Sequence, residues 1–167
     1  MEIHKKLEPA IVAYLMQYQA DDLTTWPDSM RNSANQFRIY AGESDNLKDG
    51  QAILVIAEDS NEETPQYTGN FMIPIQIWLR TPTKVLTASE TAALKKKAIE
   101  NHDAAASLLS DALNQDPFLL AGYFNSSGSD FTIMGGIMGL KPERFEAPNF
   151  FASGWSFQVY AMNKTAP

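Results

Sequence analysis

The sequence predicts an α+β domain in which one mixed or mainly antiparallel β-sheet packs against an N-terminal helix and one long helix. Apolar residues recur at helical spacing in two segments, and they alternate or run continuously, as in strands, in several others. The order along the chain is helix, strands, long helix, strands, which is typical of α+β domains. With 167 residues, the chain is expected to form a single domain covering 1–167.

The first half of the chain contains one predicted helix and two short predicted strands. Residues 3–19 predict an amphipathic helix, and the alternative is a helix that begins near Glu8, with Pro9 in its first turn. A short strand is expected at 37–40. The run AILVIA at 52–57 follows Gly50 and is rich in β-branched residues, so it predicts a strand buried on both faces.

Residues 69–80, GNFMIPIQIWLR, form the strongest strand pattern. Their odd positions are all large and apolar, which predicts one buried face: Phe71, Ile73, Ile75, Ile77 and Leu79. Pro74 has no N–H group and therefore predicts an edge strand, without a neighbour on one side, or alternatively a bulge over a helix. Met72 and Trp78 share the outer face with Pro74.

The second half predicts the long helix and two further strands. Thr87 and Glu90 form a capping box and Pro117 ends the pattern, so a helix is expected at 88–113, about 39 Å long. Its small residues predict a close approach to the sheet. A strand starting at Asp130 should bend or bulge at Gly135 and Gly136, and a connection at 141–154 should lead to a last strand at 155–162.

The composition excludes several classes of protein. Cysteine is absent, which excludes disulfides, thiolate metal sites and cysteine nucleophiles. The net charge of −7 argues against a protein that grips nucleic acid, and the run Lys95, Lys96, Lys97 is expected to be a solvated helix face. The start, MEIHKKLEP, lacks signal-peptide features, and no apolar run approaches the roughly 20 residues of a membrane span, so a cytoplasmic address is expected.

No catalytic, cofactor-binding or metal-ligating residues are assigned, and an enzyme is not expected. The two histidines are His4, near a terminus, and His102, on the apolar stripe of the long helix, where we expect a hydrogen-bonded core histidine. Zinc sites need three or four ligands. The alternative of a hydrolase would require an exposed His102 beside Ser107, Ser110 or an acid from another element.

Five large or rigid residues are candidates for a protein interface instead. Aromatic residues and methionine are enriched at interfaces, and the PNFF stretch is expected to lie in an exposed connection. The candidates are Met72, Pro74, Trp78, Phe150 and Phe151. Packing of these side chains beneath helices or loops is the alternative.

The order of several short motifs resembles that of the tail-terminator or tail-completion (neck) proteins of long-tailed bacteriophages. The motifs are, in order, Ala57-Glu58, TGN at 68–70, LRTP at 79–82, a long helix containing His102, FTIMGGI at 131–137, Glu143-Arg144, and WSFQV at 155–159. The segment between residues 20 and 50 and the PNFF insertion depart from this pattern, which leaves open another neck or head-completion protein.

The resemblance implies a virion structural protein without a cofactor, assembled in the host cytoplasm. Its members form a ring, usually a hexamer, that caps the tail tube and joins it to a head-closure protein of the neck, with DNA only as passing cargo in the lumen and no membrane partner. Pro74, Met72 and Trp78 would then lie at a junction between subunits. A different class of function, a small-ligand or peptide-binding module, predicts a closed monomer with a deep cavity near His102.

Overall fold

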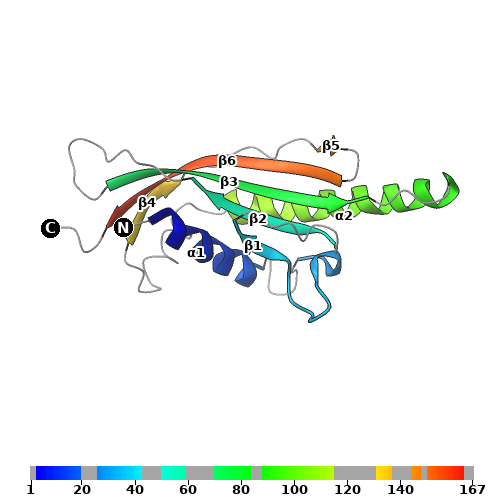
Figure 1. The fold of residues 1–167 in the computed structure, drawn as a ribbon, viewed down its shortest axis with the longest axis horizontal. Helices are drawn as coiled ribbons and strands as arrows, with labels where there is room; N and C mark the ends of the chain where they lie inside the picture. Colours follow the sequence, from blue (N-terminus) through cyan, green and yellow to red (C-terminus); the bar gives the residue numbers. More distant parts are fainter. Residues whose placement is uncertain are drawn as a thin grey trace.

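The helices and strands lie within the part of the chain that the computed structural model describes: residues 3–19, 26–42, 50–58, 70–83, 88–114, 131–136, 144–147 and 150–163. The elements in order are α1 (Ile3–Gln17), a 3₁₀ turn (Asp28–Met30), β1 (Ile39–Ala41), β2 (Ala52–Ala57), β3 (Asn70–Pro82), α2 (Ala88–Asn114), β4 (Phe131–Gly136), β5 (Phe145–Ala147) and β6 (Phe150–Asn163). This order of helix, strands, long helix, strands matches the prediction (Figure 1).

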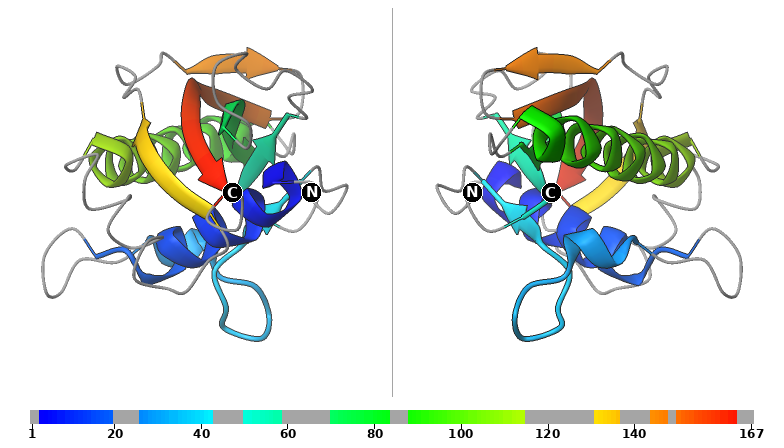
Figure 2. Two further views of the ribbon diagram at one scale, coloured as in Figure 1. Left: turned by 90° about the vertical axis from the view of Figure 1, so that its left-hand side faces the viewer. Right: turned by 90° about the vertical axis from the view of Figure 1, so that its right-hand side faces the viewer.

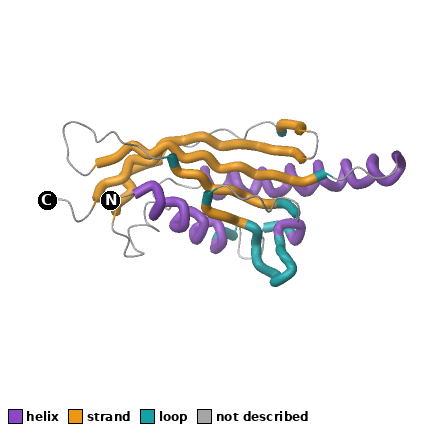
Figure 3. Tube along the Cα trace, in the orientation of Figure 1, coloured by secondary structure: helices purple, strands orange, loops and turns teal. Residues whose placement is uncertain are grey.

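The strands form one six-stranded mixed sheet in the order β1-β2-β3-β6-β4, with β5 paired to β6 near the start of that strand. Strands β1 and β2 are parallel, and every other described pair is antiparallel. The two longest strands, β3 and β6, pair along the whole of β3, from Asn70 opposite Met162 to Pro82 opposite Phe150 (Figure 3). The predicted α+β class with a mixed sheet is therefore confirmed.

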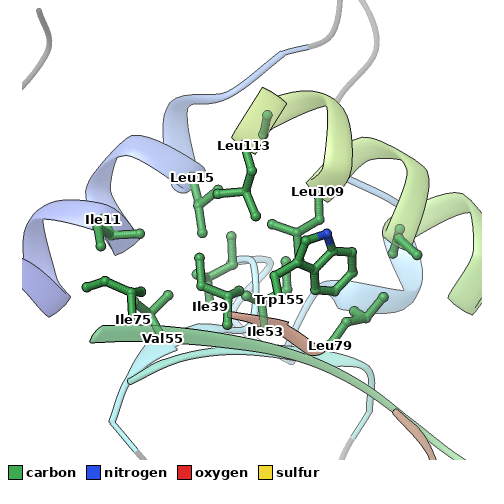
Figure 4. Close-up of a cluster of buried hydrophobic side chains, with 14 of the residues drawn as sticks. Ile11, Leu15, Ile39, Ile53, Val55, Ile75, Leu79, Leu109, Leu113 and Trp155 are labelled. Atoms are coloured by element: carbon green, nitrogen blue, oxygen red, sulfur yellow. The ribbon is translucent and has the colours of Figure 1, made fainter. Parts of the chain in front are cut away.

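Both helices lie on the same face of this sheet. Helix α1 contacts β1 and β2, whereas α2 contacts β3 and β6, so the helices divide the sheet between them (Figure 2). Between helices and sheet lies a core that includes Leu7, Ile11, Leu15, Ile53, Val55, Ile73, Ile75, Ile77, Leu79, Ala105, Leu109 and Trp155 (Figure 4). Burial of each large aliphatic side chain contributes about 1.5–3 kcal/mol. The predicted inward face of β3 is correct at each described position.

Side-chain hydrogen bonds join α1 to the rest of the fold, and one of them runs from Trp26 Nε1–H to the carbonyl of Leu15 over 2.7 Å. The Tyr14 hydroxyl donates to the carbonyl of Ala112 in α2 over 2.8 Å. Burial, with a smaller contribution from Tyr18, raises the pKa of Tyr14 above its usual value of 10.0. At the other end, Glu8 Oε1 accepts the N–H of Ala57, the last residue of β2. These contacts hold α1 in place although Pro9 lies inside this helix. The helix spans Ile3–Gln17, close to the predicted 3–19, and the alternative start near Glu8 is wrong.

The prediction that β3 is an edge strand is wrong, because β2 and β6 flank it on both sides. Pro74 is tolerated because of where β2 ends. The last β2 pair joins Ala57 to Ile75, and the Pro74 carbonyl accepts the N–H of Glu58 over 2.9 Å. The N and C=O groups of a strand residue point to the same side of the strand. The position without an N–H group therefore faces Glu58, just beyond the end of β2. The pairing of Pro74 with Gln158 of β6, on the other side, needs no donor from Pro74.

The predicted exposed connection at 141–154 is also wrong in its last part. Phe150 and Phe151 are the first two residues of β6, which begins five positions before the predicted Trp155. Phe151 is buried at 2% exposure, with its ring edge-on to His102. The bulge predicted at the glycine pair is confirmed, since the β4–β6 register shifts between Ile133 and Gly135.

Candidate functional site: the sheet face opposite the helices

The sheet face that points away from α1 and α2 carries several aromatic residues. Residues paired across neighbouring strands lie on the same face of a sheet. One such row across four strands consists of Tyr40, Leu54, Trp78 and Gly154. The neighbouring rows add Arg80 and Phe145, both aligned with Ala152, and Phe150. We call Tyr40, Trp78, Arg80, Phe145 and Phe150 the aromatic face. No described helix covers it.

Side chains of the aromatic face are accessible to a partner. Phe145 is 64% exposed, the largest value among the described large hydrophobic residues, while Tyr40, Trp78 and Phe150 are half-buried. Leu54 and Ala52, which pair with Trp78 and Arg80, are fully buried and lie at the base of the aromatic face. A buried floor with half-buried aromatic rings above it is typical of the centre of a protein interface.

Trp78 lies flat on the sheet because its partner in β6 is Gly154. A Cβ atom at position 154 would be 2.7 Å from Cζ3 of the indole, closer than any real contact allows. The indole Nε1–H donates to Gln76 Oε1 over 3.2 Å, and Gln76 Nε2 donates to Glu58 Oε1 over 3.2 Å. These contacts fix the ring orientation before a partner arrives, which lowers the entropic cost of binding.

Arg80 adds a cation beside the rings. Its guanidinium carbon is 5.6 Å from the centre of the Phe150 ring, within the range of a cation–π interaction. Its Nε is buried and has no hydrogen-bond partner among the described residues. Tryptophan, tyrosine and arginine are the residues most enriched among those that dominate binding energy at interfaces.

The five sequence-predicted interface candidates end up in different places. Trp78 and Phe150 belong to the aromatic face, and Pro74 is half-buried on the same face. Phe151 packs in the core and is not available to a partner. The backbone of Met72 pairs with Tyr160, but its side chain lies outside the described residues.

Sequence reasoning missed Tyr40, Arg80 and Phe145 as members of this face. Phe145 belongs to β5, a strand of three residues that is too short for an alternation pattern. Tyr40 and Arg80 lie at alternating positions of predicted strands, so alternation alone could have placed Arg80 with Trp78 on the outer face. Their proximity to Phe150 depends on the strand order, which the sequence did not predict.

His102 lies on the opposite side of the sheet and is fully buried. Its Nδ1 is 2.8 Å from Thr81 Oγ1, and its Nε2 is 2.8 Å from Ser153 Oγ. Gln51 Nε2 donates both to Thr81 Oγ1 and to the carbonyl of Asn101, which can only accept, and this fixes the orientation of the amide.

Hydroxyl groups flank both ring nitrogens of the imidazole. Thr81 Oγ1 accepts from Gln51 Nε2 and also forms the hydrogen bond with Nδ1 of His102. Nε2 of His102 is hydrogen-bonded to the Ser153 hydroxyl. The predicted hydrogen-bonded core histidine is confirmed, because His102 is fully buried and hydroxyl groups lie within hydrogen-bond distance of both ring nitrogens.

A cavity of about 510 Å³ lies between α2, the end of β3 and β5. Its lining includes Gln51 and Thr81 from the polar chain, together with Leu94, Ala98, Asn101 and Phe151. His102 is behind this wall and does not line the cavity. The volume is within the range of small-molecule sites, about 300–1,000 Å³.

The described ranges contain neither a cluster of metal ligands nor a helix that could cross a membrane. No group of three or more metal-ligating side chains is close enough there to hold an ion. Neither helix has a stretch that is long and apolar enough to cross a membrane, judged over the same residues. No protein-family model and no curated protein matches the chain.

Proposed function

We propose that the chain is a virion structural protein: a ring-forming tail terminator that caps the tail tube of a long-tailed bacteriophage and joins it to the head–neck complex. The observation that supports assembly best is the aromatic face, which presents oriented aromatic rings and an arginine on a sheet face that no described helix covers. The order of motifs along the sequence supports the assignment to a phage neck.

The aromatic face suits contact with another folded chain better than contact with a small molecule. It is a broad face of the sheet rather than the cavity, which lies beside α2. Its rings are spread over β1, β3, β5 and β6, so a partner must cover several strands at once. Large, shape-matched contacts of this kind are characteristic of permanent assemblies.

The proposal is tested by removing the most exposed ring of the face. Phe145→Ser costs little folding energy because the side chain is 64% exposed, and Met16→Ser, at 38% exposure on α1, is the matched control. Native mass spectrometry and light scattering should show rings for the unaltered chain and for Met16→Ser, in the presence of purified tail-tube protein, and weakened rings for Phe145→Ser. Trp78→Asp should abolish them.

The result that contradicts the proposal is a chain that remains monomeric with and without the tail-tube protein. If rings form but bind only the head-closure protein in a pull-down, the chain is another neck component. Assembly that is unchanged in both Phe145→Ser and Trp78→Asp would remove the aromatic face from the interface.

The cavity beside α2 favours a second candidate, a small-ligand or peptide-binding module. Asn101, Thr83 and Lys97 line it with polar groups, and the Asn101 carbonyl among them accepts from Gln51. Leu94 and Phe151 add an apolar surface. Ala98→Phe would fill the cavity. A binding module should then lose any small molecule that co-purifies in native mass spectra, whereas a tail terminator should assemble as before.

A further inference from the structure

Helix α2 extends well past the end of the sheet. In Figure 1 its N-terminal half projects beyond the ends of β3 and β6, while its C-terminal half lies against the sheet. The six side chains at 92–97 are all exposed, and Leu94 is 41% exposed. We call residues 92–97 the arm. Isolated helical segments of this length are marginal in water, so the arm depends on the packed half of α2 or on a partner.

The exposed charges of α2 are separated along its length. The arm carries Lys95, Lys96 and Lys97, whereas the exposed side of the packed half carries Glu100, Asp103 and Asp111, which we call the acidic half. The helix macrodipole favours anions near the N-terminus of a helix and cations near its C-terminus. Asp111 nevertheless lies in the last turn, which has no basic residue. Lys96 and Lys97 lie four and three residues before Glu100, a spacing that favours the helix. The stability of the helix does not account for Asp111 in its last turn.

Most of these charges lack partners within the described chain. Lys95 is 3.8 Å from Glu146 and Asp103 is 3.2 Å from Arg144, and these two pairs attach β5 to α2. No ion pair to a described residue involves Lys96, Lys97 or Glu100. The chain has a net charge of −7, so without the three lysines of the arm it would carry −10. The rest of a second copy is therefore an attractive partner for the arm.

We infer that the arm of one subunit docks against the acidic half of α2 in a second copy of the chain. The two surfaces are different parts of the molecule, so the contact is head-to-tail and repeats from subunit to subunit until a ring closes. Leu94 provides an apolar contact beside the lysines. The inference rests on the proposed ring and names the surface that joins neighbouring subunits.

Charge exchange between the two surfaces provides the test. Lys96→Glu/Lys97→Glu reverses the arm, and Glu100→Lys/Asp111→Lys reverses the acidic half, leaving the pairs of Lys95 and Asp103 intact. Rings of either variant alone should have a dissociation constant at least about tenfold higher than rings of the unaltered chain, which corresponds to about 1.4 kcal/mol. An equal mixture of the two should restore rings in which the variants alternate. Lys5→Glu/Lys6→Glu on α1 changes the net charge by the same amount as the arm variant and is its control.

Sedimentation velocity at low and high salt, with purified tail-tube protein present and absent, separates the outcomes. Rings that weaken in both arm and acidic-half variants, recover on mixing and weaken at high salt support the docking, because salt screens exposed charges. Rings that persist in either variant, or no recovery on mixing, overturn it while leaving the proposed function standing. An unaltered chain that forms no ring under any condition overturns both.

Discussion

Replacing Gly154 with alanine tests the contact that holds Trp78 flat on the sheet. An added Cβ would lie 2.7 Å from Cζ3, 2.9 Å from Cη2 and 3.0 Å from Cε3 of the indole. Carbon atoms prefer separations of about 3.5–4.0 Å. The ring must therefore move by roughly 1 Å, and its hydrogen bond to Gln76 is strained or lost.

Two opposing effects decide the sign of the stability change. Glycine to alanine at a position with an ordinary backbone conformation usually stabilises a protein by about 0.4–1 kcal/mol, because the unfolded chain loses freedom. Overpacking against a fixed side chain costs about 1–3 kcal/mol. The displaced indole outweighs the entropic gain, so Gly154→Ala should destabilise the subunit by about 1 kcal/mol.

Urea denaturation of a double-mutant cycle measures this coupling. In a Trp78→Ala background nothing remains for the new methyl group to displace, so Gly154→Ala should become stabilising. The change of sign between the two backgrounds is the expected result. If Gly154→Ala stabilises the chain while Trp78 is present, the indole does not rest on residue 154 and the proposed orientation of the aromatic face is wrong.

Three further predictions concern buried polar groups. Thr81→Val removes the hydroxyl that is hydrogen-bonded to His102 Nδ1 and accepts from the Gln51 amide, so urea denaturation should show a loss of about 2–4 kcal/mol. Ser153→Ala removes the hydroxyl that is hydrogen-bonded to His102 Nε2 and should cost about 1–3 kcal/mol, against less than about 0.5 kcal/mol for the exposed control Ser156→Ala. Because the pKa of Tyr14 is raised in the folded state, its contribution to the free energy of unfolding is complete below about pH 10 and is lost as pH rises through the folded-state pKa. Chemical denaturation of Tyr14→Phe should therefore show a smaller fall in stability between about pH 9 and 12 than the unaltered chain shows. An equally steep fall in the variant would contradict this.

Elements with a strong local signal were predicted closely. Strand β2 spans Ala52–Ala57 as predicted, because its continuous β-branched run is buried on both faces. Helix α2 begins at Ala88, directly after the capping-box threonine, and ends at Asn114, one residue beyond the prediction. In both cases residues close in sequence define the boundaries.

The errors arose where neighbours distant in sequence decide the structure. A proline is excluded from the interior of a sheet only where a neighbouring strand would need its N–H group. Strand β2 ends at Ala57, opposite Ile75, so it does not extend past Pro74, and the local sequence cannot reveal this length. Phe150 and Phe151 follow a proline and an asparagine, which locally favour a loop, yet pairing with Pro82 and Thr81 of β3 makes them strand residues. Neither partner can be recognised from the stretch itself.

The candidate site was predicted in part. Trp78 and Phe150 were identified from their residue type, but the face they share depends on the β3–β6 register, which joins segments about seventy residues apart. The role of Gly154 under the indole has no sequence signal at all. The same holds for the hydrogen-bonded chain from Gln51 to His102, whose members are ordinary polar residues until the sheet brings them together.

The position of β6 between β3 and β4 has a consequence for synthesis of the chain. This strand follows all the other described elements in sequence, yet it occupies the interior of the sheet. While the ribosome is still translating, β3 has an unpaired side and β4 and β5 have nothing to pair with, and exposed strand edges of this kind promote aggregation. A product that terminates before residue 150 cannot complete the sheet, so premature termination yields no folded domain, and the fold forms only in chains translated through β6.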